Sequence, residues 1–312
     1  MATTVLGTFR ANRQIAHQTP TAAARHDSIG FPSGSDASGG HDVPEQARLI
    51  FVGGLHRSGT TPLARVLGGH PQVSGLTDTG VPEDEGQHLQ GVYPKIRTHG
   101  GLGRFATVPA AHLTEESSLC TPENKERLLA SWRPYWDASR RFWLEKSPPN
   151  LIMGRFLQGL FPDSFLIMVV RHPVAVALAS HKWNPILISR KGRWRRTLPG
   201  LVENWVAAHR ILEADSPRLE RLLVVNYEHL SAQPEAELER IQHHLGLTTP
   251  IDGSAITGDH SSGYEEAWAA MRTGTPLRRY SRHVIERRFS ADVRHFGYDL
   301  ADLSELVRWD DR

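Results

Sequence analysis

The chain has 312 residues and a formal net charge of +2, with 39% hydrophobic and 22% charged residues. This balance is typical of a globular protein with a sizeable core, and it lacks the strong basic excess of a nucleic-acid-binding domain. A single cysteine, Cys120, excludes an internal disulfide framework and a cysteine-rich metal site, and it favours a cytoplasmic location. No apolar run approaches the roughly 18 residues needed to span a membrane.

The composition predicts a tail followed by one domain. Residues 1–46 are rich in Ala, Thr, Ser, Gly and His, with no acidic residue before Asp27. Such a segment cannot bury enough apolar surface to fold, so we predict a disordered N-terminal tail. A transit peptide has a similar composition and stays open as an alternative. Residues 47–312 are predicted to form the folded domain.

The first folded stretch predicts a strand, a glycine turn and a helix. Residues 49–52 form a continuous apolar run, typical of a strand buried on both faces, and apolar residues recur at helical spacing from Thr60 onward. Between them, Gly54 and Gly59 stand in the frame of the nucleotide P-loop, G-x-x-x-x-G-K-[ST]. Such a turn presents backbone N–H groups to one anion, usually a phosphate.

The loop departs from the nucleotide P-loop in one respect. Thr60 occupies the lysine position, which argues against nucleoside triphosphate hydrolysis but not against phosphate binding. Residues 56–61, His-Arg-Ser-Gly-Thr-Thr, resemble the 5′-phosphosulfate-binding loop of sulfotransferases that use 3′-phosphoadenosine 5′-phosphosulfate (PAPS). With Arg57 in it, the loop resembles that of the tyrosylprotein and carbohydrate sulfotransferases more than that of the cytosolic small-molecule enzymes, which carry a lysine there. The resemblance implies a donor-binding loop made of Gly54, His56, Arg57, Ser58, Gly59, Thr60 and Thr61.

An acidic stretch, residues 77–89, follows the first helix. A hydroxyl acceptor loses a proton as it attacks, and a nearby carboxylate can take that proton. The tyrosylprotein enzymes, which the chain resembles, carry their catalytic glutamate in this part of the chain. Counting without gaps selects Asp78, but the surrounding sequence differs, and we favour Glu85, then Glu83, then Asp78. His88 and His99 are alternative bases.

Lys146 ends a short strand predicted over residues 141–146. In open α/β sheets, ligands sit beyond the carboxyl ends of the strands. An ammonium group there could stabilise charge on a transferring sulfuryl group, and the sulfotransferases that the chain resembles carry a lysine at the equivalent strand end. The alternative is a surface lysine paired with Glu145.

A second motif follows the apolar run of residues 165–170, which ends in Arg171-His172-Pro173. It resembles the 3′-phosphate-binding segment of the sulfotransferases, in which a strand-end arginine and a helix serine hold the phosphate. The planar guanidinium can bind two phosphate oxygens at once. The family's serine falls where this chain has Ala179, so Ser180 is the candidate if the turn is one residue longer. The resemblance also implies a late basic lid, for which Arg278 and Arg279 are candidates.

The remaining elements are predicted from apolar spacing, capping residues and glycine or proline stops. A further buried strand begins at Leu222, and its exit resembles the family's Val-x-Tyr-Glu-x-Leu segment, with a structural role for Tyr227 and Glu228. Helices are predicted over residues 122–139, 150–160, 201–212, 234–245, 265–271 and 284–289, and another begins at Val174.

These elements predict one α/β domain with a P-loop-like, mainly parallel sheet and helices on both faces. The resemblance, over roughly residues 48–250, implies the sulfotransferase fold and transfer of a sulfuryl group from PAPS to an acceptor hydroxyl, leaving 3′-phosphoadenosine 5′-phosphate. Arg57 and Lys146 would stabilise the negative oxygens. No clustered metal ligands are found in the sequence, and no metal or nucleic acid is expected. Protein tyrosine, carbohydrate, lipid and secondary metabolite all stay open as acceptors, and so does the oligomeric state.

Two alternative functions place different requirements on the sequence. A P-loop kinase would need a lysine at position 60 and a Mg²⁺-binding aspartate after a strand, whereas two of the predicted strands end in Arg171 and Asn226. A non-catalytic nucleotide-binding module would keep both phosphate loops but would need no proton acceptor.

Overall fold

The structure is a computed structural model, and it describes residues 47–183, 197–256, 262–301, 303 and 307–309. The predicted tail, residues 1–46, lies outside the described residues, so the division into tail and domain stays a prediction. Within the described part of the chain, no helix is both long and apolar enough to cross a membrane.

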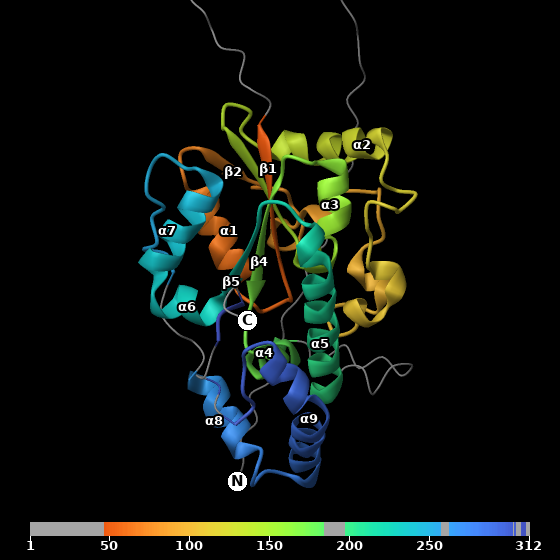
Figure 1. Ribbon diagram of the computed structural model, residues 1–312, viewed down its shortest axis with the longest axis vertical. Coiled ribbons are helices and arrows are strands. Elements are labelled where there is room, and N and C mark those ends of the chain that lie inside the picture. Colours follow the sequence, from red (N-terminus) through yellow and green to blue (C-terminus); the bar gives the residue numbers. More distant parts are fainter. Residues whose placement is uncertain (1–46, 184–196, 257–261, 302, 304–306, 310–312) are drawn as a thin grey trace, which may run out of the picture. The chain divides into compact units, whose positions relative to one another are not determined.

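The predicted mainly parallel sheet is confirmed. Its five strands are all parallel and lie in the spatial order β2-β3-β1-β4-β5 (Figure 1). The strands are β1 Arg48–Gly54, β2 Val73–Gly75, β3 Phe142–Lys146, β4 Phe165–Val170 and β5 Leu222–Asn226. Four of them were predicted, because strands covered on both faces are almost uninterrupted apolar runs. β2 has only three residues, too few for a pattern.

Helices cover both faces of the sheet, as predicted. Their bounds are α1 Thr60–Gly68, α2 Pro122–Trp132, α3 Gly154–Leu160, α4 Pro173–Trp183, α5 Leu198–Asp215, α6 Tyr227–Ala232, α7 Pro234–Leu245, α8 Ser262–Ala270 and α9 Pro276–His295. Figure 1 places α1 and α7 on one side of the sheet and α3 and α5 on the other. Two apolar clusters correspond to these faces: Leu63 and Ile241 belong to one, and Phe156 and Trp205 to the other.

Several helices differ from their predicted bounds, and α5 and α8 each begin three residues before the helices predicted over 201–212 and 265–271. The helix predicted over 122–139 ends at Trp132, because Pro134 cannot continue the hydrogen-bond ladder. The helix predicted over 150–160 begins only at Gly154, after a 3₁₀ turn. The helix predicted over 284–289 is the 20-residue α9, whose start is capped by the Thr275 side chain with proline at the first position. Most residues of α9 are polar or charged, so its few apolar residues do not show the helical spacing clearly.

The strand order brings the candidate residues to one edge. β1 lies between β3 and β4, and all the carboxyl ends point toward α4 in Figure 1. The connection after β1 leads to β2 on one side of β1, whereas the connection after β3 leads to β4 on its other side. Ligands of open α/β sheets bind at such a switch point. Beside it the chain forms 3₁₀ turns at 82–84, 86–88, 96–99, 105–107 and 109–111 instead of helices or strands.

Candidate active site

The glycine loop, residues 54–61, joins β1 to α1 and has the predicted strand–turn–helix arrangement. Gly59 stands before the first residue of α1 with φ +96°, a left-handed conformation that side chains disfavour. A Cβ atom on Gly59 would lie 2.3 Å from Cδ2 of Tyr227. Arg57 also has a positive φ, 72°, which places a non-glycine residue in a sparsely populated conformation at the apex of the loop.

The glycine loop fits an anion. The Ser58 side chain is fully buried, and its Oγ atom has no hydrogen-bond partner among the described residues. The Nδ1 atom of His56 is likewise buried and without a partner within the described part of the chain. Buried polar atoms normally find partners, and these two lie where α1 begins. Since the first N–H groups of a helix also lack internal partners, a phosphate or sulfate group would satisfy several donors at once.

His56 contributes a neutral ring to this loop. Burial, reinforced by the nearby cations Lys146 and Arg57, lowers its pKa to about 3. Its ring packs edge-on against Phe105, 6.4 Å between centroids. The positive charge at this end of the site therefore comes from Arg57 and Lys146, while His56 can offer only uncharged hydrogen bonds near neutral pH.

Lys146 joins the end of β3 to the glycine loop and to the acidic stretch. Its ammonium group donates to Oγ1 of Thr61 at 3.3 Å, to the backbone oxygen of Glu83 at 2.9 Å and to Oε1 of Glu85 at 3.3 Å. Lys146 and Glu85 are both buried. An ammonium so held cannot move freely, and it carries its charge directly beside the first turn of α1.

Glu85 lies at the site, and the two other candidate carboxylates lie nearer the surface. Oε2 of Glu85 accepts a hydrogen bond from Nε2 of Gln87 at 2.6 Å. The Glu83 side chain is 54% exposed and its carboxylate lies 3.9 Å from Arg65, while Asp78 is exposed. The structure therefore brings Glu85 together with Lys146 and leaves the Glu83 and Asp78 side chains outside that contact.

Of the two alternative histidine bases, one lies beside the acidic candidate. Nε2 of His88 is 3.5 Å from Oε2 of Glu85. Burial lowers the pKa of His88, although the neighbouring carboxylate of Glu85 opposes that shift. His99 ends a separate 3₁₀ turn, Ile96–His99.

Arg171 reaches the glycine loop from the end of β4. Its Nη1 atom donates to the backbone oxygen of Arg57 at 3.0 Å, and its guanidinium lies 4.1 Å from the ring centroid of Tyr227. The same ring closes over Gly59. The two motifs that the sequence places 114 residues apart are thus neighbours, joined through one tyrosine.

The three other predicted donor-binding residues lie in the helices α4 and α9. Ser180 is buried in α4. Arg278 and Arg279 are exposed in the first turn of α9. Among the described residues of the late part of the chain, Tyr264 of α8 approaches Arg171, with its ring centroid 5.5 Å from the guanidinium carbon. Arg278 and Arg279 stay predictions for the lid.

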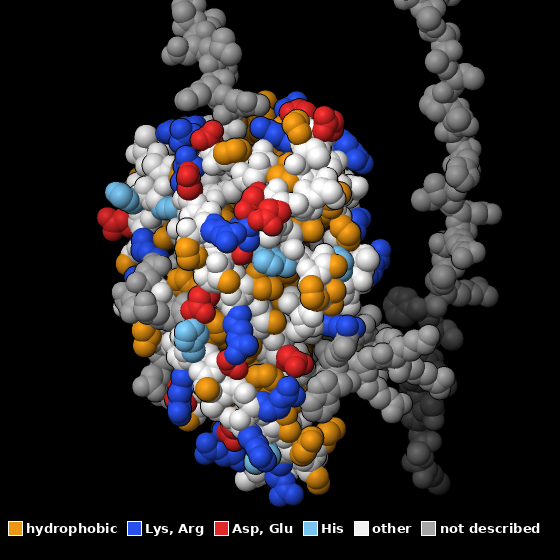
Figure 2. All heavy atoms as spheres, turned by 45° about the vertical axis from the view of Figure 1, so that its right-hand side comes forward, with side chains coloured by type: hydrophobic (Ala, Val, Ile, Leu, Met, Phe, Trp, Pro, Cys, Tyr) orange, Lys and Arg blue, Asp and Glu red, His pale blue; other side chains and the backbone are white. Residues whose placement is uncertain are grey.

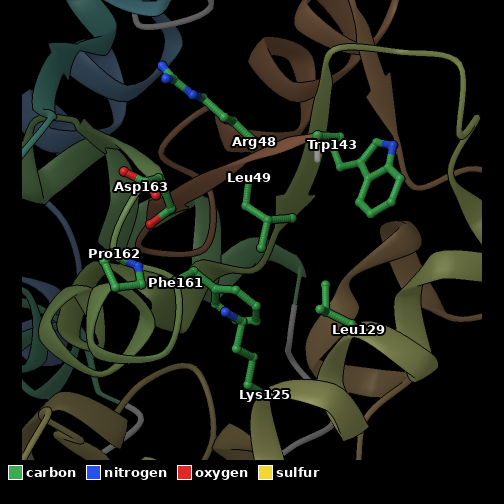
Figure 3. A pocket seen from close by; sticks show the side chains of 10 residues that line it. Arg48, Leu49, Lys125, Leu129, Trp143, Phe161, Pro162 and Asp163 are labelled. Atoms are coloured by element: carbon green, nitrogen blue, oxygen red, sulfur yellow. The ribbon is translucent and has the colours of Figure 1, made fainter. Parts of the chain in front are cut away.

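Two hollows lie at opposite edges of the sheet. One, of about 380 Å³, runs beside α1 and is lined in part by Thr61, Asp78 and Lys146. The other, of about 420 Å³, lies at the amino ends of β1 and β3, where Figure 3 shows Leu49, Trp143 and Phe161 around it. Only the first adjoins the glycine loop, so the second plays no part in the candidate site.

Surface charge on the face in Figure 2 is mixed. Acidic and basic side chains alternate over most of that face, and basic side chains gather toward its lower end. α9 carries the exposed arginines Arg278, Arg279, Arg287, Arg288 and Arg294. Among the described residues, no group of three or more His, Cys, Asp or Glu is arranged to hold a metal ion.

Several residues of the site were not predicted to have a role there. Tyr227 and Tyr264 contact Arg171 from distant elements, and no local pattern signals such contacts. Gln87, which binds Glu85, sits among acidic and glycine residues that read as a loop. The sequence suggests Glu145 only as an ion-pair partner of Lys146, but its carboxylate accepts hydrogen bonds from Gly86, Ser147 and Asn150.

Comparison with known proteins gives a family match. A family model described as "Sulfotransferase family" matches residues 49–250. The nodulation protein NoeE of Sinorhizobium fredii is 22% identical over 227 residues, which is 66% of this chain and 51% of that protein. The match thus spans about half the length of this relative.

Solved structures give weaker likenesses. The sulfotransferase STF1 from Mycobacterium tuberculosis is 18% identical, with a TM-score of 0.49, over 78% of this chain and 77% of that one. A sulfotransferase from Alicyclobacillus acidocaldarius is 16% identical, with a TM-score of 0.44, over 78% and 98% of the two chains.

Proposed function

Since the chain belongs to the sulfotransferase family, we propose that its donor is PAPS and that the acceptor is a hydroxyl group. The glycine loop would hold the 5′-phosphosulfate, with Ser58, Thr60 and the backbone N–H groups of α1 as donors. Arg171, together with Ser180 of α4, would hold the 3′-phosphate. The acceptor would be a protein tyrosine, carbohydrate, lipid or secondary metabolite.

One observation carries the choice of donor. Nη1 of Arg171 lies 3.0 Å from the backbone oxygen of Arg57, so a buried guanidinium lies directly beside the loop proposed to bind the 5′ group. A ligand with one anionic group at each end of a nucleoside would satisfy both sites at once. A nucleoside triphosphate places its charge at the 5′ end alone and would leave Arg171 without a phosphate.

The chemistry follows from the contacts of Lys146 and Glu85. When bound, PAPS supplies an activated sulfuryl group whose bond to the 5′-phosphate oxygen breaks as a bond to the acceptor oxygen forms. Lys146 and Arg57 would stabilise the negative charge on the sulfuryl and bridging oxygens. The acceptor proton would pass to the carboxylate of Glu85, which Lys146 and Gln87 hold in place.

The donor proposal is tested by nucleotide binding. We expect 3′-phosphoadenosine 5′-phosphate to bind at least about a hundredfold more tightly than ATP, because the charge-assisted hydrogen bonds of one added phosphate are worth a few kcal/mol. Isothermal titration calorimetry at fixed ionic strength measures both affinities, with adenosine 5′-phosphate as a control that lacks the 3′ group. Equal affinities for the bisphosphate and ATP would contradict the proposal.

The base is tested by a series of isosteric substitutions. Glu85→Gln is expected to lower kcat about a hundredfold or more, because it removes the general base. Glu83→Gln and Asp78→Asn are expected to stay within about threefold of the parent protein, because both side chains lie outside the contact with Lys146. Transfer from labelled PAPS to an acceptor found by incubation with a cell extract gives the rates. A large loss in either control and none in Glu85→Gln would move the role to another carboxylate.

A further inference from the structure

Glu145 is the buried carboxylate of the site that the proposed reaction leaves unused. It is fully buried, one residue before Lys146 on β3. Successive residues of a strand point to opposite faces, and the two side chains accordingly bind different groups. Lys146 binds Thr61, Glu83 and Glu85, whereas the carboxylate of Glu145 accepts hydrogen bonds from neutral donors.

The donors to Glu145 form a clamp on the acidic stretch. The backbone N–H of Gly86 donates to Oε1 of Glu145 at 3.0 Å, and the Ser147 hydroxyl donates to the same oxygen. The amide of Asn150 donates to Oε2 of Glu145 at 2.6 Å and to the backbone oxygen of Val52 at 3.1 Å. The clamp therefore ties the acidic stretch to the ends of both β1 and β3.

Further contacts fix Gly86 and the next residue of the acidic stretch, Gln87. The backbone N–H of Gln87 donates to Oγ of Ser147 at 2.9 Å, and Nε1 of Trp132 donates to the backbone oxygen of Gly86 at 3.0 Å. A Cβ atom on Gly86 would lie 2.6 Å from Oε1 of Glu145. Only glycine allows so close an approach at this position, so the backbone rests directly on the carboxylate.

We infer that Glu145 is a positioning residue: its carboxylate holds the Gly86 backbone and thereby sets the adjacent Glu85 against Lys146. This inference rests on the proposed function, in which Glu85 takes the acceptor proton. It assigns Glu145 a role in the geometry of the base without contact with donor or acceptor. A misplacement of about 1 Å in a catalytic group costs about a hundredfold in rate.

The clamp also depends on the charge state of Glu145. The ionised carboxylate accepts three hydrogen bonds, from Gly86, Ser147 and Asn150, and protonation of either oxygen would displace one of them. Burial raises the pKa of Glu145 to about 7, although Ser147, Asn150 and Lys146 oppose the shift. The titratable groups around it are Lys146, Glu85 and Tyr93. Activity should therefore rise with pH through about 7, as the clamp becomes ionised.

The test compares Glu145→Gln with the parent protein and with Glu237→Gln, which alters a buried carboxylate on α7 that binds Arg240 and Arg308. In Glu145→Gln we expect amide hydrogen exchange in residues 85–88 to be at least about tenfold faster. We expect kcat to fall about a hundredfold, with the KM for PAPS within about twofold. The rise in kcat through pH 7 should disappear. Gly86→Ala should give the same exchange and kcat changes, and Glu237→Gln should give none of them.

The outcomes separate this inference from the proposed function. Unchanged exchange in residues 85–88, or a lower melting temperature with an unchanged kcat and pH profile, would show that Glu145 only stabilises the fold. Calorimetry with 3′-phosphoadenosine 5′-phosphate tests the donor site alone. Glu145→Gln and Gly86→Ala should leave the affinity for this nucleotide unchanged. If the parent protein fails to bind the nucleotide, the proposed function fails, while the exchange data still decide whether Glu145 holds the acidic stretch.

Discussion

Replacing Lys146 with methionine is expected to lower kcat about a thousandfold, while the affinity for 3′-phosphoadenosine 5′-phosphate changes much less. Lys146 is the buried cation that contacts both Thr61 and Glu85. Removing one preorganised donor to developing negative charge costs about 10²–10³ in rate, and Lys146 would also orient the base. Initial rates with labelled PAPS and calorimetry with the bisphosphate measure the two effects.

Stability must be separated from chemistry in this experiment. Lys146→Met leaves Glu85 buried without its cation, which destabilises a protein by about 3–5 kcal/mol. The double variant Lys146→Met/Glu85→Gln removes both charges and should recover most of the melting temperature while remaining inactive. Lys125→Met, which changes a lysine at the opposite edge of the sheet, should keep full activity. A folded Lys146→Met protein with more than a tenth of the parent rate would rule out the proposed role.

Replacing Arg171 with alanine is expected to weaken binding of 3′-phosphoadenosine 5′-phosphate about a hundredfold and binding of adenosine 5′-phosphate only a few-fold. The guanidinium is the buried cation assigned to the 3′-phosphate, and hydrogen bonds to charged groups are worth about 1.5–3 kcal/mol. The ratio of the two affinities, measured by calorimetry, isolates the 3′ end of the ligand.

Two companion substitutions sharpen the Arg171 experiment. Arg171→Lys keeps the charge but loses the planar fork, so an intermediate loss is expected. Arg288→Ala removes an arginine on α9 that is 48% exposed and should leave both affinities unchanged. An equal loss for both nucleotides in Arg171→Ala would mean that the residue supports the glycine loop and does not read the 3′-phosphate.

Much of the sheet was predictable because burial on both faces leaves strands with almost no polar interruption. The runs before Gly53 and before Arg171 identified β1 and β4, and parallel strands bring their carboxyl ends to the same edge. The proximity of Arg171 to the glycine loop follows from the parallel pairing of these two strands. The preference for Glu85 over Glu83 and Asp78 agrees with the side chain that contacts Lys146, although its catalytic role stays a prediction.

The acidic stretch and its surroundings could not be derived in the same way. The 3₁₀ turns between Pro82 and Ala111 have no repeating apolar pattern. The turn that begins at Gly86 is held by side chains from β3 and α2, which lie far away in the sequence. The alternation of side chains along β3 could have shown that Glu145 and Lys146 face opposite ways. The sequence alone, however, does not reveal that the Glu145 carboxylate meets the backbone of Gly86.

The Tyr227 ring has a consequence for how variants of this protein should be interpreted. The Tyr227 ring packs against Gly59, and the guanidinium of Arg171 lies 4.1 Å from the centroid of the same ring. A change at either residue therefore shifts a shared partner, and the energetic effects of paired substitutions will not sum. Substitutions at the two ends of the proposed nucleotide site are therefore expected to be epistatic, and a single substitution there measures a joint property of three residues.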